Sequence, residues 1–122
     1  SFLYKTDGTA KIWKLDSKTK KELSYIQATT NKSIVKKINE LEWVEGAIYA
    51  NTYQAQKDVV VIINPANGAV DGIINFAGLR KKVEQLPNLD VLNGIAYHPG
   101  RKTFFVTGKN WSKLFEVTIE KK

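Results

Sequence analysis

Apolar and polar residues alternate over short stretches along most of the chain, which is the period of half-buried β-strands. The predicted strands cover residues 10–16, 22–28, 40–44, 47–53, 59–63, 69–76, 94–98, 102–107 and 111–119. One segment, residues 79–86, has its apolar residues at spacings of four and three, which predicts a single short helix that ends before Pro87. The pattern as a whole, about ten strands and at most one helix, predicts an all-β protein.

Turn signals join several of these strands into hairpins. Glu45-Gly46 is a two-residue connection between two strands, and Pro99-Gly100-Arg101 is predicted to form a second hairpin of the same type. The run from Asn64 to Gly68 combines Pro with Asn-Gly, which is typical of a turn.

A five-residue pattern occurs twice. Asn39-Glu40-Leu41-Glu42-Trp43 has the form Asn, any, aliphatic, any, aromatic, and Asn93-Gly94-Ile95-Ala96-Tyr97 repeats it 54 residues later. A tight turn and an apolar strand follow both copies. A period of about 40–50 residues that carries four short strands is typical of a β-propeller blade. We therefore expect the two copies to be the same strand of successive blades, with Trp43 and Tyr97 buried at equivalent places.

The chain is too short for a closed ring. By this period it holds about two and a half four-stranded antiparallel blades, and propellers need about four or more. Residues 1–122 are therefore predicted to form a partial β-propeller domain. Terminal blades would leave apolar faces and strand edges open, so either another chain or a missing N-terminal half is expected to complete the propeller.

Composition excludes several kinds of site. Hydrophobic residues make up 43% and charged residues 25% of the 122 residues, as in an ordinary globular domain. The longest aliphatic run, residues 59–63, is far shorter than the roughly 20 residues of a membrane-spanning helix. No basic and apolar leader opens the chain, so we expect no signal peptide in these residues; one removed earlier is an open alternative. The absence of cysteine excludes disulfides and thiol catalysis, and the single His98 excludes any site with two histidines.

The net charge of +7 raises the question of an anionic partner. The lysines, however, form small groups in segments that are predicted to be turns. Neither an RNA-binding aromatic motif nor a recognition helix accompanies them. Solvated turns are therefore the favoured interpretation, and nucleic-acid binding is not expected.

Several blocks of the sequence together resemble one enzyme family. They are residues 39–43, 46–51, 78–79, 92–97, 106–109 and 111–117, in order and with compatible spacing over nearly the whole chain. In these blocks the chain is similar to the glutamine cyclotransferase family of plants and bacteria. The resemblance implies a five-bladed propeller of which this chain is the C-terminal half. It also implies an extracytoplasmic, periplasmic or secreted, location.

The activity implied by the resemblance is conversion of an N-terminal glutamine to pyroglutamate with release of ammonia. The substrates would be N-terminal glutaminyl peptides or proteins, and no metal or cofactor would be needed. The free α-amine attacks the side-chain amide carbonyl of the same residue. This reaction needs a carboxylate to carry the proton, donors for the oxyanion, and an apolar wall that folds the side chain back.

The resemblance also assigns candidate site residues. Asn39 and Lys109 match a family asparagine and lysine at the central cavity and are the catalytic candidates. Tyr53 falls where the family usually carries tryptophan, and it is a substrate-binding candidate together with Glu40 and Trp111. The family's acid/base glutamate lies in the N-terminal half, so this chain is expected to lack that carboxylate and to be inactive by itself.

Each candidate also has a purely structural interpretation. Asn39 can be a turn asparagine, Lys109 an exposed turn lysine, and Tyr53 and Trp111 packing residues. Glu40 shares a strand face with Glu42, and such a pair is most often a solvated surface. After Gln54 the chain departs from the family pattern and is about two residues longer. These departures keep open an alternative function, a non-catalytic propeller that binds peptide or protein partners.

Overall fold

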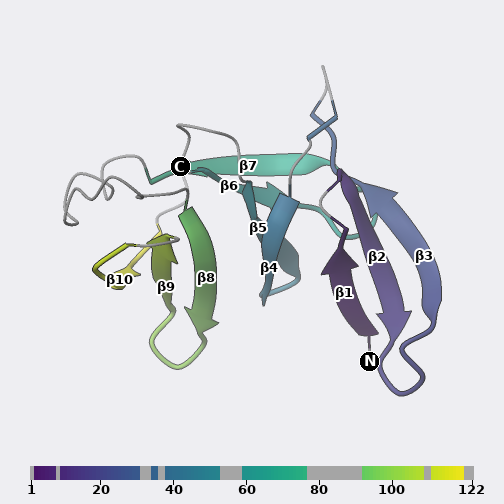
Figure 1. Ribbon diagram of the computed structural model, residues 1–122, viewed down its shortest axis with the longest axis horizontal. Coiled ribbons are helices and arrows are strands. Elements are labelled where there is room, and N and C mark those ends of the chain that lie inside the picture. The colour runs from purple at the N-terminus through teal and green to yellow at the C-terminus, as the bar shows by residue number, and fades with distance from the viewer. Residues whose placement is uncertain are drawn as a thin grey trace.

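Ten strands form three antiparallel sheets in the computed structural model, which describes residues 2–7, 9–30, 34–35, 38–52, 59–76, 92–108 and 111–119 (Figure 1). The first sheet has the order β1(Phe2–Thr6), β2(Lys11–Asp16), β3(Glu22–Gln27). The middle sheet has the order β4(Ile38–Val44), β5(Ala47–Thr52), β6(Val59–Ile63), β7(Val70–Asn75). The last sheet has the order β8(Leu92–His98), β9(Thr103–Gly108), β10(Phe115–Val117). All the regular elements in these described ranges are strands, and the helix predicted at residues 79–86 lies outside them.

The predicted strands are confirmed with two exceptions. β1 was not among the predicted strands. The last strand is much shorter than the predicted residues 111–119, so that prediction of its extent is wrong. Before β10 the backbone N–H of Trp111 donates to the Gly108 carbonyl at 3.0 Å, and the Thr107 hydroxyl donates to the Lys113 carbonyl at 2.8 Å. These bonds hold residues 111–114 outside the strand pairing.

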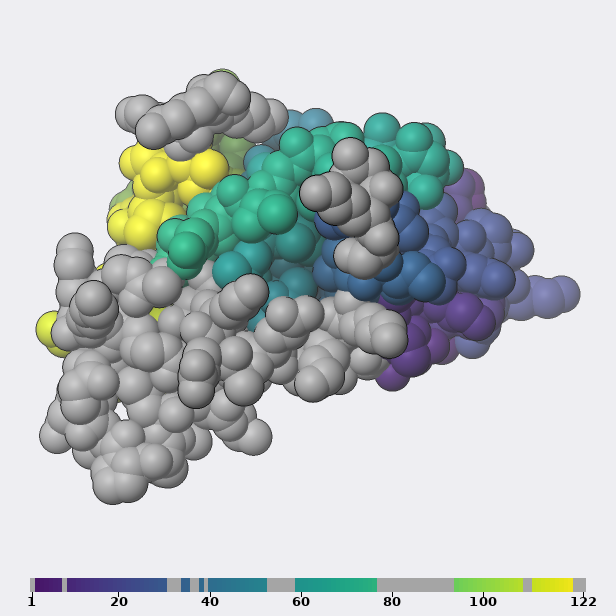
Figure 2. Space-filling model, turned by 90° about the horizontal axis from the view of Figure 1, so that it is seen from above, coloured from purple at the N-terminus to yellow at the C-terminus, as the bar shows by residue number. Residues whose placement is uncertain are grey.

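The middle sheet is buried on both faces, and it lies between the other two sheets in the view from above (Figure 2). Ile48 and Ala50 of β5 point into a core shared with the first sheet, which includes Ile12. Tyr49 of β5 points into a second core shared with the last sheet, which includes Phe104 and Val106. Burial on both faces explains why β6 is a continuous apolar run rather than an alternating one.

The repeated pattern is confirmed as one repeated strand. β4 and β8 are each the first strand and an edge strand of their sheets. Each has a β-bulge at the repeated asparagine, since the register shifts between Ile38 and Leu41 and between Leu92 and Gly94. Asn39 and Asn93 therefore occupy the same place in two sheets.

The predicted burial of the two aromatic residues is wrong for Trp43 and holds only in part for Tyr97. Trp43 is 51% exposed, whereas Tyr97 is half-buried against Phe104 at a ring distance of 4.9 Å. Trp43 stacks on Tyr4 of β1 with ring centroids 5.7 Å apart and planes within 7°. Because β1 is itself a sheet edge, nothing from the described chain covers the rest of the Trp43 indole.

The two hairpins differ in their turns, so the prediction that they share one type is wrong. Glu45 and Gly46 both have positive φ, 48° and 89°, and form the two-residue turn between β4 and β5. His98 pairs with Thr103, so the second connection has four residues. Pro99 explains the difference, because its ring fixes a negative φ where the two-residue turn needs a positive one.

The turn from Asn64 to Gly68 connects β6 to β7 and packs against the first sheet. Gly68 has φ +79° and lies against the backbone of Gln27, so closely that a Cβ there would overlap the Gln27 carbonyl. Its own carbonyl accepts the Thr29 N–H at 3.0 Å, and the Thr29 carbonyl accepts the Val70 N–H at 2.8 Å. The glycine thus permits both the turn and the close contact between sheets.

Alanine substitutions at Gly46 and Gly68 separate the cost of a positive φ from the cost of disturbing the close backbone contact. Gly46→Ala meets only the conformational cost of a positive φ, since nothing lies within 4 Å of the added Cβ. We expect it to lower the free energy of unfolding by about 1–2 kcal/mol. Gly68→Ala should cost at least about 1 kcal/mol more, because the backbone of Gln27 must also move. Urea titrations of both variants measure the difference, and equal losses would show that the close contact at Gly68 contributes nothing.

Candidate active site

The starts of β4 and β8 and the ends of β5 and β9 lie at one end of the molecule. Ile38 pairs with Thr52 and Leu92 pairs with Gly108, which places each start beside an end. β4 and β8 are neighbours. Glu42, near the end of β4, and Glu45, in the turn that follows, both contact Tyr97, near the end of β8. The two bulges therefore lie at the same end, which we call the bulged end.

Asn39 and Glu40 belong to the β4 bulge. A bulge leaves residues outside the regular pairing and re-aims their side chains, and bulges are common beside active sites. The backbone of Asn39 is placed by the bulge, while its side chain lies outside the described part of the chain. The Glu40 side chain is exposed at this end.

Glu42 has a different environment from Glu40. Its carboxylate accepts the backbone N–H of Tyr97 at 2.7 Å, and Glu45 accepts the Tyr97 hydroxyl at 3.3 Å. Burial and then the charge of Glu45 raise the pKa of Tyr97. Glu42 therefore links the edge strands β4 and β8 through a hydrogen bond. Of the two carboxylates on β4, Glu40 is the exposed one.

Asn51 is the polar residue at the bulged end that the sequence analysis did not select. Its side chain is fully buried, and neither its amide nitrogen nor its carbonyl oxygen has a hydrogen-bond partner among the described residues. Asn51 pairs with Val60 on one side, and on the other it lies opposite the β4 bulge. Buried polar groups are normally paired, so an unpaired carboxamide is a candidate ligand-binding group. The available sequence signal was an asparagine near the end of an apolar strand, inside one of the resemblance blocks.

Trp111 is half-buried and packs beside the end of β9. Its ring meets Phe115 edge-on, at 6.4 Å and 85°, and joins the core between the middle and last sheets. A Cβ on Gly108 would overlap the indole, so only glycine allows this contact. Trp111 therefore fixes the backbone that leads directly into Lys109.

Asp7 is a described carboxylate just after β1. It accepts the Thr9 N–H at 3.0 Å, a short hydrogen bond from the Thr9 hydroxyl, and the Trp13 indole N–H at 3.4 Å. The bonds from Thr9 lower the pKa of Asp7 most. A proton-carrying group works best with a pKa near the working pH, so Asp7 fits a structural anchor better than a proton shuttle.

The structure thus brings together part of the predicted site. The Asn39 backbone, Glu40 and Trp111 are placed at or near the bulged end. Lys109 and Tyr53 lie outside the described residues, but Gly108 and Thr52, which directly precede them, are both at this end. The assigned roles of all five candidates remain predictions.

No group of three or more His, Cys, Asp or Glu side chains in the described ranges could hold a metal ion. No helix in that part of the chain is long and apolar enough to cross a membrane.

Comparison with known proteins gives one consistent result. The family model described as glutamine cyclotransferase matches residues 1–119. A glutaminyl-peptide cyclotransferase of Arabidopsis thaliana is 32% identical over 120 residues, which are 97% of this chain and 37% of that protein. The crystal structure of Myxococcus xanthus glutaminyl cyclase superposes with a TM-score of 0.86 at 36% identity, over 95% of this chain and 50% of that one. The chain therefore spans half or less of the length of these relatives, and it belongs to the glutamine cyclotransferase family.

Proposed function

We propose that this chain is the C-terminal half of a five-bladed β-propeller that acts as a glutaminyl-peptide cyclotransferase. The observation that carries the proposal is the match to the Myxococcus glutaminyl cyclase, which extends over 95% of the chain with a TM-score of 0.86. The paired bulges of β4 and β8 support the repeated blades. An extracytoplasmic location and N-terminal glutaminyl peptides or proteins as substrates are part of the same proposal.

The proposed reaction is an intramolecular acyl transfer. The α-amine nitrogen forms a bond to the side-chain amide carbon, the bond from that carbon to the amide nitrogen breaks, and ammonia leaves. A carboxylate takes the proton from the attacking amine and delivers it to the leaving nitrogen. In the proposal this carboxylate is supplied by the N-terminal half of the propeller.

The residues of this chain act on the oxyanion and on the shape of the substrate. Lys109 donates a charged hydrogen bond to the oxygen that gains negative charge in the transition state, and Asn39 donates a neutral one. Tyr53 and Trp111 form the aromatic wall that keeps the glutamine side chain folded toward its own amine. Glu40 contacts the peptide from the exposed side of the bulge.

Asn51 is added to this site because of its burial. A carboxamide with two unpaired polar atoms costs stability unless a ligand or a neighbouring group meets it. Its place opposite the β4 bulge suits a residue that holds the substrate amide or orients Asn39.

The first functional prediction concerns the oxyanion donors. In the full-length protein that carries this chain, Lys109→Ala should lower turnover of a glutaminyl dipeptide by about 10²–10³, the typical loss of one oxyanion donor. Asn39→Ala should lower it less, because a neutral donor contributes less than a charged one. Ammonia release is the assay. If the folded, monodisperse wild-type protein releases no ammonia, the enzyme proposal is wrong and the peptide-binding propeller takes its place.

Tyr53→Trp tests the aromatic wall. The substitution restores the aromatic residue that the family usually carries, and it removes a hydroxyl that needs a partner. We expect turnover to be kept or raised. A drop of tenfold or more in kcat/KM would show that the Tyr53 hydroxyl, and not its ring, is what the site uses.

Asn51→Leu tests whether the buried carboxamide serves function or folding. Replacing an unpaired buried amide by an apolar group of similar size should raise the free energy of unfolding by about 1 kcal/mol. Turnover of the glutaminyl dipeptide should fall at the same time. Loss of stability would show that the carboxamide is paired in the folded protein, and unchanged turnover would remove Asn51 from the site.

A further inference from the structure

We propose that a cavity between the first sheet and the turn from Asn64 to Gly68 binds a small organic carboxylate, and that Lys14 recognises its charge. The cavity is formed by residues of this chain, so the inference does not need the other half of the proposed propeller. It goes beyond the proposed reaction and does not rest on it.

The cavity has the size and the lining of a small-molecule site. Its volume is about 360 Å³, which lies within the range of roughly 300–1,000 Å³ that is typical of such sites. Polar groups on one part of its wall come from Tyr4, Lys14 and Ser24. Apolar surface on the rest of the wall comes mainly from Ile12, Ile26 and Pro65. A few polar groups among apolar walls can fix both the charge and the orientation of a ligand.

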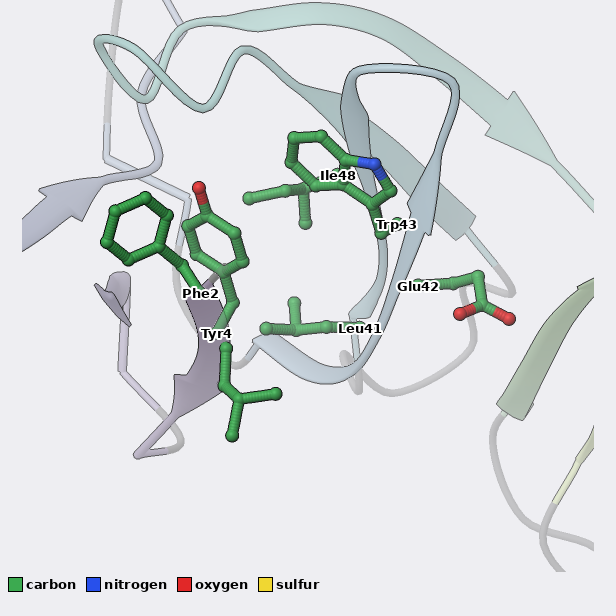
Figure 3. Close-up of a pocket in the computed structure, with 7 residues that line it drawn as sticks. Phe2, Tyr4, Leu41, Glu42, Trp43 and Ile48 are labelled. Atoms are coloured by element: carbon green, nitrogen blue, oxygen red, sulfur yellow. The ribbon is translucent and has the colours of Figure 1, made fainter. Parts of the chain in front are cut away.

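The three polar side chains lie in one row across the first sheet. Tyr4 pairs with Lys14, and Lys14 pairs with Ser24, so all three point to the same face. Ile12, two residues before Lys14 on β2, packs in the core between the first and middle sheets, so this face is turned toward the middle sheet. Figure 3 shows Ile48 of the middle sheet pointing toward Tyr4.

The position of Lys14 has an equivalent in the middle sheet. The strand pairing shifts directly after Lys14 in the first sheet and directly after Ile62 in the middle one, in both cases near the following turn. Each of the two residues also pairs with a tyrosine of the preceding strand, which is Tyr4 in the first sheet and Tyr49 in the middle one. Lys14 and Ile62 therefore hold the same place in two sheets.

The two equivalent positions differ in their chemistry. Ile62 packs against the apolar cluster between the middle and last sheets, to which Tyr49 belongs. The first sheet has a cation at this place and a cavity beside it. If the position served packing alone, an aliphatic residue would suffice, as it does in the middle sheet. The lysine therefore points to a ligand that its charge can meet.

Lys14 has no charged partner in the described chain. The ion pairs in the described ranges join other residues, Lys5 with Glu22 and Arg101 with Glu116. The half-buried Lys14 ammonium instead lies 3.8 Å from the centre of the Phe2 ring. A ring face attracts a cation, but it does not use all three donors of an ammonium group. Donors therefore remain for a ligand in the cavity.

The charges of this region and the cavity wall define the class of ligand. Residues 1–37 carry nine of the 19 Lys and Arg residues but three of the 12 Asp and Glu residues, so their field favours an anion. A carboxylate can accept a charged hydrogen bond from Lys14, and its second oxygen can accept one from the hydroxyl of Ser24 or Tyr4. A short apolar body fits the remaining wall, and benzoate combines both features.

The test measures binding of fluorobenzoate to the full-length protein that carries this chain, by fluorine NMR. Fluorobenzamide, which has a similar shape and no charge, is the control ligand. Lys14→Ile gives this position the residue type that Ile62 has in the middle sheet. Lys11→Ile is the matched control variant, because Lys11 lies on the opposite face of β2, over the rings of Trp13 and Tyr25 at 5.8 and 4.8 Å.

We expect fluorobenzoate to bind the wild-type protein with a millimolar Kd, and fluorobenzamide to bind at least about tenfold more weakly. Lys14→Ile should raise the Kd of fluorobenzoate by at least about tenfold, the typical loss of a charged hydrogen bond. Lys11→Ile should change it by less than about twofold, because an exposed charge on the other face is screened. Ala66→Trp fills the cavity from the turn and should also prevent binding.

Four results would overturn the proposal. Equal binding of the two ligands would show an apolar cavity that does not recognise charge. An unchanged Kd in Lys14→Ile, or displacement of fluorobenzoate by a glutaminyl dipeptide, would place the carboxylate at another site. The fourth is an absence of fluorobenzoate binding at millimolar concentrations.

Circular dichroism shows whether each variant is folded. If Lys14→Ile does not fold, Lys14→Gln removes the charge and keeps a polar side chain, and the same rise in Kd is expected. None of these measurements uses ammonia release, so the enzyme proposal is tested separately.

Discussion

The packing of each sheet against its neighbours is the constraint on which the rest of the structure depends. The middle sheet buries apolar residues on both faces, with Ile48 and Ala50 toward the first sheet and Tyr49 toward the last. A three- or four-stranded sheet cannot bury both faces by itself, so its stability comes from the adjacent sheets. The same stacking keeps the edge strands β4 and β8 side by side, which brings their bulges to one end. Fold and candidate site therefore have a common physical origin.

Close backbone contacts at a few positions make this stacking possible. Gly68 allows the middle sheet to meet the backbone of Gln27, and Gly108 allows Trp111 to lie against β9. Glu42 adds a polar link, because it accepts a backbone hydrogen bond from the next sheet at an edge that would otherwise be open. This role also separates Glu42 from Glu40, although the two carboxylates alternate along one strand.

Most of the fold follows from local signals in the sequence. Alternation, one continuous apolar run and the turn signals between them located nine of the ten strands, although the last was predicted too long. The two asparagine patterns identified equivalent strands in two sheets. The burial of Trp43 could not be predicted, because it depends on a neighbour at the β1 edge and not on the pattern around the residue itself. The prediction of one turn type for both hairpins is wrong, because Pro99 fixes a negative φ where the two-residue turn requires a positive one. Asn51 was missed because an unpaired buried amide is visible only when the surrounding packing is known.

The division of the proposed site between two halves follows from the same architecture. In a ring of sheets, every inner edge strand contributes to one central end, so no consecutive half of the ring holds all the groups that meet there. This half supplies hydrogen-bond donors and aromatic surface in the proposal, and it places the exposed carboxylate of Glu40 at that end. A cyclisation that must move a proton from an amine to ammonia needs a carboxylate poised to do both. In the proposal, the second half of the propeller closes the ring and supplies the carboxylate that carries the proton.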